Sequence, residues 1–247
     1  MPRFFVRPED VIQNKIKIFG DEYNHIKNVL RLKCGEKITV SDGTGTDYTA
    51  VIDSFESNSV VASILSSQSS TTEPPIDVVL YQGVPKSDKM DLIIQKSVEL
   101  GIKKIVPVLT ERTIVKFGNE KDINTKVSRW QRIALEASKQ CNRGVVPVIE
   151  RPMAYSNAIE SSKDSELRII PFENEKDNTL KSILKCDSKK SISFFIGPEG
   201  GFSEDEVIRA KLSGVVPVTL GPRILRTETA GFVVLSILMY ELGDVSL

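Results

Sequence analysis

Long apolar runs without polar alternation dominate the chain from residue 76 onward, and they constrain the fold more than any other feature. The runs are IDVVLYQGVP, KKIVPVLT, GVVPVIE, ELRIIPF, SISFFIGP and VVPVTLGP. A strand with one solvent-facing side alternates apolar and polar residues, so a continuous run indicates a strand buried on both faces. Segments with helical apolar spacing separate the runs, notably at 89–100, 126–140, 204–212 and 229–242. This alternation predicts an α/β domain with a parallel sheet.

The last of these helices is apolar nearly all round. Its sequence, AGFVVLSILMYEL, offers no polar face to solvent. Such a helix must be covered on most sides, either by the core of its own domain or by another subunit. Both remain open here, and a homodimer is the more specific hypothesis.

The first 65 residues have a different pattern, with short strands such as KIKIF, KITVSD and DYTAVIDSF and one helix at Tyr23–Leu32. Asp42-Gly43-Thr44-Gly45 is a turn signal between two strands. We therefore predict a compact β-rich unit, a small barrel, over residues 1–70. The polar stretch SSQSSTTEPP is typical of a linker, and the α/β domain is expected over 76–247.

Charge and cysteine content exclude several classes of protein. The chain has 33 lysine and arginine residues and 33 aspartate and glutamate residues. This balance argues against a protein that coats nucleic acid nonspecifically, but it does not exclude a local basic face. Cys34, Cys141 and Cys186 are far apart and form no CxxC pair, so neither a disulfide framework nor a metal site is expected. No signal peptide or membrane-length apolar run is evident, and we expect a cytoplasmic protein without membrane association.

The loop IGPEGG, Ile196–Gly201, follows an apolar strand and precedes a helix, as phosphate-binding loops do. It matches neither the Walker pattern nor GxGxxG. Pro198 lacks an N–H that a phosphate nest would need, and Glu199 would repel a phosphate. A ligand with a neutral or cationic part is more compatible, and a plain tight turn is the competing interpretation. Ser203 and Glu206 form a capping box that starts the next helix in either case.

A second strand ends in the same way, with Gly221-Pro222, a loop and a helix that we expect to be capped by threonine. In a parallel sheet both loops lie at the carboxyl edge, where α/β proteins bind ligands. The second loop holds Arg223, Arg226 and Glu228 within six residues. Charges so closely spaced at a strand end favour a functional role.

GPEGGFSEDE together with LGPRILRTETA closely resembles the ribosomal small subunit methyltransferase E family. PRFFV, HIKNVLRLKCGEKI, VPKSDKMDLIIQKSVELGIKKIVPVLTERT and RWQRIALEASKQCNR extend the resemblance along the chain in the family's order. The family is of the SPOUT class, so the resemblance implies a parallel sheet with a C-terminal trefoil knot, against the general rule that chains do not thread loops. It also implies a PUA-like barrel that binds RNA at the N-terminus, and a homodimer with its site near the interface.

The resemblance further implies S-adenosylmethionine as cofactor, bound largely through backbone groups. The residues expected to hold it are Ile196, Gly197, Pro198, Glu199, Gly200, Gly201, Leu220, Gly221, Ile224, Leu225 and Thr229. The cofactor's cationic sulfonium, and the absence of phosphate in it, agree with the loop's chemistry.

The implied reaction is methylation of N3 of a uridine in 16S ribosomal RNA of the small subunit. N3 becomes a nucleophile only when its proton leaves, so a catalytic group must stabilise the resulting anion. Arg226 is the first candidate for this role and Arg223 the second. Glu228 is a candidate base if its surroundings favour the protonated form; otherwise it orients an arginine or simply stabilises the helix N-terminus.

RNA contacts need local positive charge rather than a global excess. The candidates are Arg3, Arg7, Arg31, Lys33, Lys86, Lys89, Arg112, Arg129, Arg132 and Arg143. The single histidine, His25, is assigned a structural or RNA-contacting role rather than that of a base. The main alternative to the enzyme is a noncatalytic RNA-binding or ribosome-assembly protein with a degenerate methyltransferase domain, and a nucleotide hydrolase is a distant third.

Overall fold

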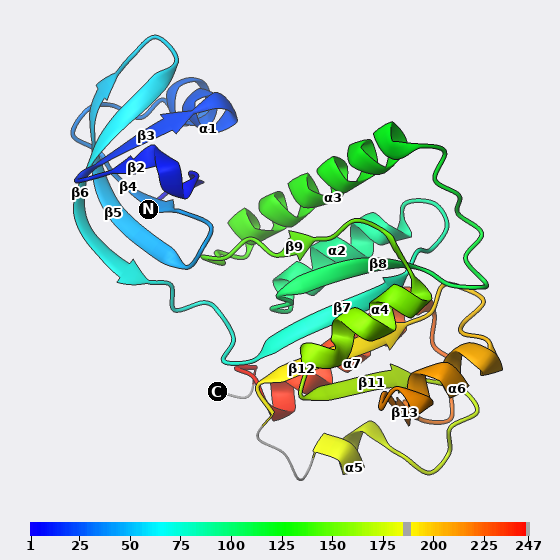
Figure 1. The fold of residues 1–247 in the computed structure, drawn as a ribbon. Coiled ribbons are helices and arrows are strands. Elements are labelled where there is room, and N and C mark those ends of the chain that lie inside the picture. Colours follow the sequence, from blue (N-terminus) through cyan, green and yellow to red (C-terminus); the bar gives the residue numbers. More distant parts are fainter. Residues whose placement is uncertain (185–188, 246–247) are drawn as a thin grey trace. The chain divides into compact units, whose positions relative to one another are not determined.

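A computed structural model describes residues 1–184 and 189–245, so Cys186 lies outside the described part (Figure 1). The chain divides into two compact units, Met1–Glu73 with Ser138–Val146, and Pro74–Ala137 with Pro147–Leu247. Among the described residues, no helix combines the length and apolar character that crossing a membrane requires.

The first unit contains a mixed six-stranded sheet in the order β1-β4-β5-β6-β3-β2, antiparallel except for the β1–β4 pair. Its strands are β1 (Arg3–Phe5), β2 (Val11–Ile12), β3 (Lys15–Phe19), β4 (Lys37–Ser41), β5 (Thr46–Phe55) and β6 (Ser59–Ser69). Ile16 and Ile18 of β3 alternate with exposed neighbours and enter a core with Phe4 and Ile38, as expected for a sheet with one buried face.

Two predicted boundaries in this unit are wrong. Ser66–Ser69, read as linker, pair with Thr46–Thr49 as the end of β6. This end of β6 is polar and exposed, so it gives no apolar signal, which is why the pattern misses it. The helical segment begins at Gly20 rather than Tyr23, as α1 (Gly20–Asn24), and continues as a π-helix (His25–Val29).

The segment Ser138–Val146 is held in the first unit by several contacts, among them those of Glu73. The Glu73 carboxylate accepts the N–H groups of Gly144 at 2.9 Å and Val145 at 3.0 Å, and it pairs with Arg143 Nη2 at 2.6 Å. Arg143 is only 4% exposed. Its prediction as an RNA contact is therefore corrected: burial and the pair with Glu73 keep the guanidinium from the surface.

The second unit contains a parallel sheet, which confirms the α/β prediction. Its order is β10-β8-β7-β12-β11-β13, with β9 also paired to β8. The strands are β7 (Asp77–Gly83), β8 (Lys104–Leu109), β9 (Val148–Ile149), β10 (Met153–Ala154), β11 (Leu167–Pro171), β12 (Ser191–Ile196) and β13 (Val216–Val218). The helices are α2 (Lys89–Glu99), α3 (Glu120–Gln140), α4 (Tyr155–Ser161), α5 (Leu180–Leu184), α6 (Glu204–Leu212) and α7 (Thr227–Glu241).

Both faces of this sheet are covered, as the unalternating runs predict (Figure 1). Tyr81 and Phe195 stack on neighbouring strands at 4.6 Å between ring centroids, in a core that includes Val207 of α6. Side chains alternate along a strand, so Gln82 and Ile196 face the opposite side. A Cβ on Gly231 of α7 would lie 3.9 Å from both side chains, which places α7 on that second face.

Helix α7 is buried on one side and keeps apolar residues on the other. Gly231, Val234 and Leu238 are buried, and the helix contacts α2 and β12. Tyr240 is 59% exposed, and Phe232 is only partly covered. Packing within the unit therefore accounts for part of the all-round apolar pattern.

The helix termini confirm some of the predicted capping residues and contradict one. The Ser203–Glu206 capping box is present, with Ser203 Oγ accepting the Glu206 N–H at 3.3 Å. Gly101 follows α2 at φ +91°, the conformation expected of a glycine after a helix. The threonine cap predicted for the last helix is wrong: α7 starts after Arg226, and no side chain caps it.

Candidate functional site

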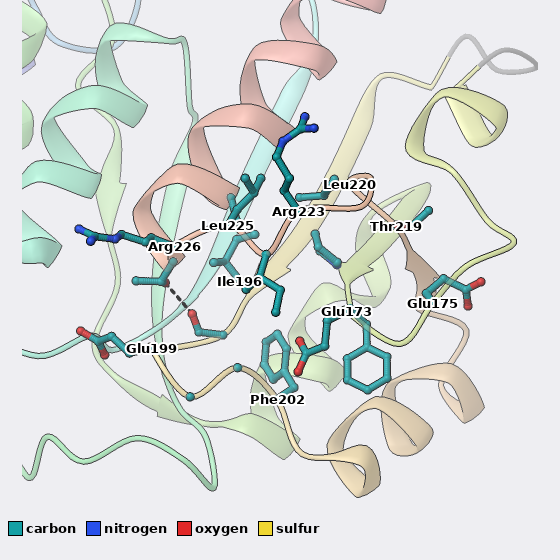
Figure 2. Close-up of a pocket in the computed structure, with 18 of the residues that line it drawn as sticks. Glu173, Glu175, Ile196, Glu199, Phe202, Thr219, Leu220, Arg223, Leu225 and Arg226 are labelled. Carbon is teal, nitrogen blue, oxygen red and sulfur yellow. Dashed lines mark hydrogen bonds between the residues drawn. The ribbon is translucent and has the colours of Figure 1, made fainter.

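A cavity of about 820 Å³ lies in the second unit, where β11, β12 and β13 end (Figure 2). Its wall comes from three loops, 171–176, 196–202 and 219–227, with Lys89 and Ala230 beside them. Both Gly-Pro loops thus meet at one cavity, as the sequence predicts from their places at the carboxyl edge of the sheet. Strand β11 lies between β12 and β13, and this order adds the third loop.

The glycine-rich loop is closely packed against neighbouring backbone. A Cβ on Gly197 would lie 2.8 Å from the Gly201 carbonyl carbon, and one on Gly83 would lie 2.7 Å from Pro198 N. The Gly201 N–H donates to the Pro198 carbonyl at 2.9 Å, and Gly201 has φ +66°. The glycines are therefore required by close approach and by a left-handed turn.

Glu199 connects this loop to the turn before α2. Its carboxylate accepts the Lys86 N–H at 3.1 Å and pairs with Lys89 Nζ at 3.0 Å. Partial burial opposes ionisation of Glu199, but hydrogen bonds from its own backbone, from Lys89 and from Lys86 outweigh burial and lower its pKa. Glu199 therefore shapes the loop.

Lys89 lies between carboxylates from two loops. Besides Glu199, it is 3.7 Å from Glu228 Oε2 at the start of α7. That oxygen is buried, and no hydrogen-bond donor in the described part of the chain reaches it. Glu228 thus keeps a free acceptor beside a cation, and Lys89, predicted to contact RNA, instead lies in the cavity wall.

Thr227 and Gln82 hold the two Gly-Pro loops together. Thr227 Oγ1 donates to the Gly197 carbonyl at 2.6 Å, and Gln82 Nε2 donates to Thr227 Oγ1 at 2.9 Å. Gln82 is fully buried at the end of β7. Sequence reasoning missed both residues, although a glutamine inside the apolar run IDVVLYQGVP was an available signal.

The turn after β8 supports the glycine-rich loop from another direction. Arg112 Nη1 donates to the Gly200 carbonyl at 2.7 Å. Next to it, Glu111 Oε2 accepts the Ser203 hydroxyl at 2.7 Å, and the Glu111 N–H donates to Glu206 Oε1 at 2.9 Å. Arg112, predicted to contact RNA, therefore contacts the candidate cofactor loop.

All but one of the predicted cofactor residues line the cavity. The exception is Thr229, which is exposed on α7 and outside the lining. Arg223 and Arg226 line its rim, and their side chains point away from the centre of the cavity in Figure 2. The structure gives neither guanidinium a side-chain hydrogen bond or ion pair with the described residues. Ile224 between them is 89% exposed.

The other predicted RNA-binding residues are spread over both units. Arg3 pairs with Asp47 at 2.6 Å, Arg7 with Asp10 at 3.1 Å, and Arg129 with Asp91. The exposed ones whose side chains have no hydrogen-bond or ion-pair partner among the described residues are Arg31, Lys33, Lys86 and Arg132. His25 forms an edge contact with Phe4, with ring centroids 5.9 Å apart, as a structural role requires.

The loop FENEK after β11 is the largest part of the site that sequence reasoning missed. Phe172, Glu173, Glu175 and Lys176 line the cavity. The Glu175 carboxylate accepts the N–H groups of Asp177 and Asn178, and these bonds lower its pKa. The available signal was that FENEK follows a strand, ELRIIPF, of the same parallel sheet.

Comparisons with known proteins agree with this architecture. Residues 72–239 match the RNA methyltransferase domain family, and residues 19–65 match the RNA methyltransferase PUA domain family. The chain is 33% identical over 99% of its length to ribosomal RNA small subunit methyltransferase E of Buchnera aphidicola subsp. Acyrthosiphon pisum (strain APS), covering 95% of that protein. It is 32% identical over 91% of its length to the protein of the same name from Bacillus subtilis (strain 168), covering 89% of that protein.

A solved structure is similar over nearly the whole chain. It is ribosomal RNA small subunit methyltransferase E from Neisseria gonorrhoeae bound to S-adenosyl methionine, with a TM-score of 0.88, 33% identity and 99% of each chain covered. The resemblance seen in the sequence motifs is confirmed. This chain belongs to the ribosomal RNA small subunit methyltransferase E family.

Proposed function

We propose that this protein is an S-adenosylmethionine-dependent methyltransferase that modifies N3 of a uridine in 16S ribosomal RNA. The observation that carries the proposal is the cavity built by both Gly-Pro loops, in a chain that matches a relative bound to S-adenosyl methionine over 99% of its length. Mass-spectrometric mapping of ribosomal RNA from cells lacking this protein tests it. Loss of one N3-methyluridine is expected, and an unchanged modification map would refute the assignment.

The cavity chemistry fits the cofactor. The lining offers backbone groups of Ile196–Gly201 and Leu220–Leu225, and Gly197 lacks the Cβ that would clash with Gly201. Pro198 and Glu199 make a phosphate ligand unsuitable, whereas a sulfonium or ammonium is compatible with a carboxylate. The cofactor, when bound, supplies an electrophilic methyl group to the site.

Arg226 is the first candidate to stabilise the uracil anion, with Arg223 next. Both guanidiniums are exposed at the rim and available to a substrate. As the N3 proton leaves, negative charge spreads to O2 and O4, where a guanidinium donates charge-assisted hydrogen bonds. The lone pair on N3 then forms the new bond to the methyl carbon, and the electron pair of the broken carbon–sulfur bond stays on sulfur.

Glu228 is the candidate acceptor of the N3 proton. Its Oε2 is buried without a hydrogen-bond donor among the described residues, and Glu228 is not among the residues that line the cavity, so substrate binding must expose this oxygen for it to act as a base. Lys89 Nζ lies 3.7 Å from this oxygen. The alternative is that Glu228 only orients Arg226 or Arg223. A Glu228→Gln variant that retains the wild-type pH–rate profile would favour that alternative.

We further propose that the protein is a homodimer and that its sheet carries a trefoil knot. Exposed Ile224, in the loop before α7, and exposed Tyr240 and partly covered Phe232, on α7, are apolar side chains that a second subunit would bury. Sedimentation that gives only monomer at working concentration would exclude the dimer.

The knot is supported by β12 lying between β7 and β11, with α7 returning to contact both β12 and α2. A knot tightens when the two ends of the chain are pulled apart, so the end-to-end length of the stretched protein should be shorter than that of a fully extended 247-residue chain.

The first unit is proposed to be a PUA-like barrel that binds RNA, with Arg31 and Lys33 as exposed contacts. Binding there should weaken as salt rises, since phosphate contacts release counterions. We place the protein in the cytoplasm, because Cys34 and Cys141 form no disulfide among the described residues and are compatible with a reducing environment. Cell fractionation tests this location.

The competing function is a noncatalytic RNA-binding or ribosome-assembly protein. The intact charged loop Arg223–Glu228 and the well-packed glycine-rich loop favour the enzyme. Calorimetric titration with S-adenosylmethionine separates the two functions, since a wild-type chain that does not bind it would favour the noncatalytic one.

A further inference from the structure

Glu173 is a carboxylate in the cavity wall that has no partner in the part of the chain that the structure describes. It is an exposed residue that lines the cavity, and no hydrogen bond or ion pair from the described residues engages its oxygens. Of the other charged side chains in the lining, Lys176 lies on the same loop as Glu173, and four more come from the other walls. Lys89 and Glu199 pair with each other at 3.0 Å, and Arg223 and Arg226 point outward (Figure 2).

The backbone that carries Glu173 is fixed on both sides. The Phe172 N–H donates to the Val218 carbonyl at 3.0 Å, which ties this segment to β13. The Glu175 N–H donates to the Phe172 carbonyl at 3.2 Å, so residues 172–175 form a closed turn. Glu173 is therefore positioned before any ligand arrives.

The side chain of Glu173 extends toward Phe202 and the glycine-rich loop, whereas Glu175 points to the opposite side (Figure 2). A Cβ on Gly201 would lie 3.5 Å from Glu173 Oε2, so this oxygen faces bare backbone. The two carboxylates thus have different roles. Glu175 holds the turn through the N–H groups of Asp177 and Asn178, and Glu173 faces the cavity with its acceptor capacity unused.

We propose that Glu173 binds the α-ammonium group of the amino-acid portion of S-adenosylmethionine; this rests on the proposed function. An unpaired carboxylate is complementary to a cation, and a charge-assisted hydrogen bond is about twice as strong as a neutral one. The cofactor carries two cationic groups. A carboxylate at the sulfonium would stabilise the ground state more than the transition state, because the positive charge on sulfur disappears as the methyl leaves. The α-ammonium keeps its charge throughout, so binding it does not slow the reaction.

Glu173→Gln tests the assignment by calorimetric titration with three probes. S-adenosylmethionine carries both cations, S-adenosylhomocysteine keeps only the ammonium, and 5′-methylthioadenosine has neither. We expect the Kd of the first two to rise about tenfold and that of the third to stay unchanged. Because Glu173 has no partner in the described structure, the melting temperature without ligand should also stay the same.

Three results would overturn the proposal. Unchanged affinity for all probes would remove Glu173 from the site. Weakening with S-adenosylmethionine alone would assign the carboxylate to the sulfonium, and equal weakening with all three would assign it to the adenosine portion. Asp177→Asn is the matched control, since it removes the same charge from an exposed residue outside the cavity lining, and it should leave all three affinities unchanged.

The same titrations separate this proposal from the proposed function. A wild-type protein that binds none of the probes contradicts the cofactor assignment itself. A wild-type protein that binds all three, with Glu173→Gln identical to it, contradicts only the role of Glu173.

Discussion

The hydroxyl of Thr227 donates a 2.6 Å hydrogen bond to the carbonyl oxygen of Gly197, which joins the first turn of α7 to the loop after β12. Thr227 Oγ1 also accepts the Gln82 amide at 2.9 Å, so one buried hydroxyl links β7 to both Gly-Pro loops. The shape of the candidate cofactor site therefore depends on a residue that adds no charge to it.

Thr227→Val should destabilise the protein, because it leaves the Gly197 carbonyl and the Gln82 amide each without one partner. Burial of such groups costs about 1–3 kcal/mol of unfolding free energy. Denaturant unfolding measures the loss, and calorimetry should show weaker binding of S-adenosylmethionine. Thr227→Ser keeps the hydroxyl and is the control. A valine variant as stable as wild type would show that this hydrogen bond is not needed to hold the loops.

The contribution of Glu199 to stability should depend on pH. Its folded-state pKa is lowered, so its stabilisation is fully present above the unfolded-state pKa of about 4.3 and is lost as pH falls through the lower folded-state value. The difference in melting temperature between wild type and Glu199→Gln should be constant from about pH 6 to 7 and shrink below about pH 4. A difference that is the same at both ends of this range would contradict the assigned hydrogen bonds and the pair with Lys89.

Arg112 and Arg132 should have separable effects, although the sequence places both in one RNA-binding set. Arg112→Ala removes the donor to the Gly200 carbonyl and should weaken cofactor binding several-fold, on the order of 1–2 kcal/mol for a charged hydrogen bond. Arg132 is exposed, so Arg132→Ala should lower only RNA affinity and its salt dependence. Each variant is the control for the other. If Arg112→Ala lowered RNA affinity and left cofactor binding intact, the original RNA assignment would be right.

The difference between these two arginines shows what a sequence pattern can predict. The parallel sheet and the two Gly-Pro loops could be predicted, because buried strands and glycine turns leave local signals. The position of β12 between β7 and β11 depends on pairing between distant segments, and local periodicity carries no record of it. The same holds for Arg143, whose partner Glu73 lies 70 positions away, and for Gln82, which meets Thr227 across 145 positions.

Arg226→Ala should abolish turnover while largely keeping cofactor binding. The Arg226 side chain points away from the cavity centre, so its removal leaves the lining formed by the glycine-rich loop intact. Loss of a group that stabilises charge only in the transition state lowers kcat by about 10²–10³-fold without a matching change in ground-state affinity. Single-turnover methylation of small-subunit RNA, with cofactor affinity measured in parallel, separates the two quantities. Arg223→Ala should have a smaller effect, and wild-type-like methylation by Arg226→Ala would transfer the anion-stabilising role to Arg223 or Lys89.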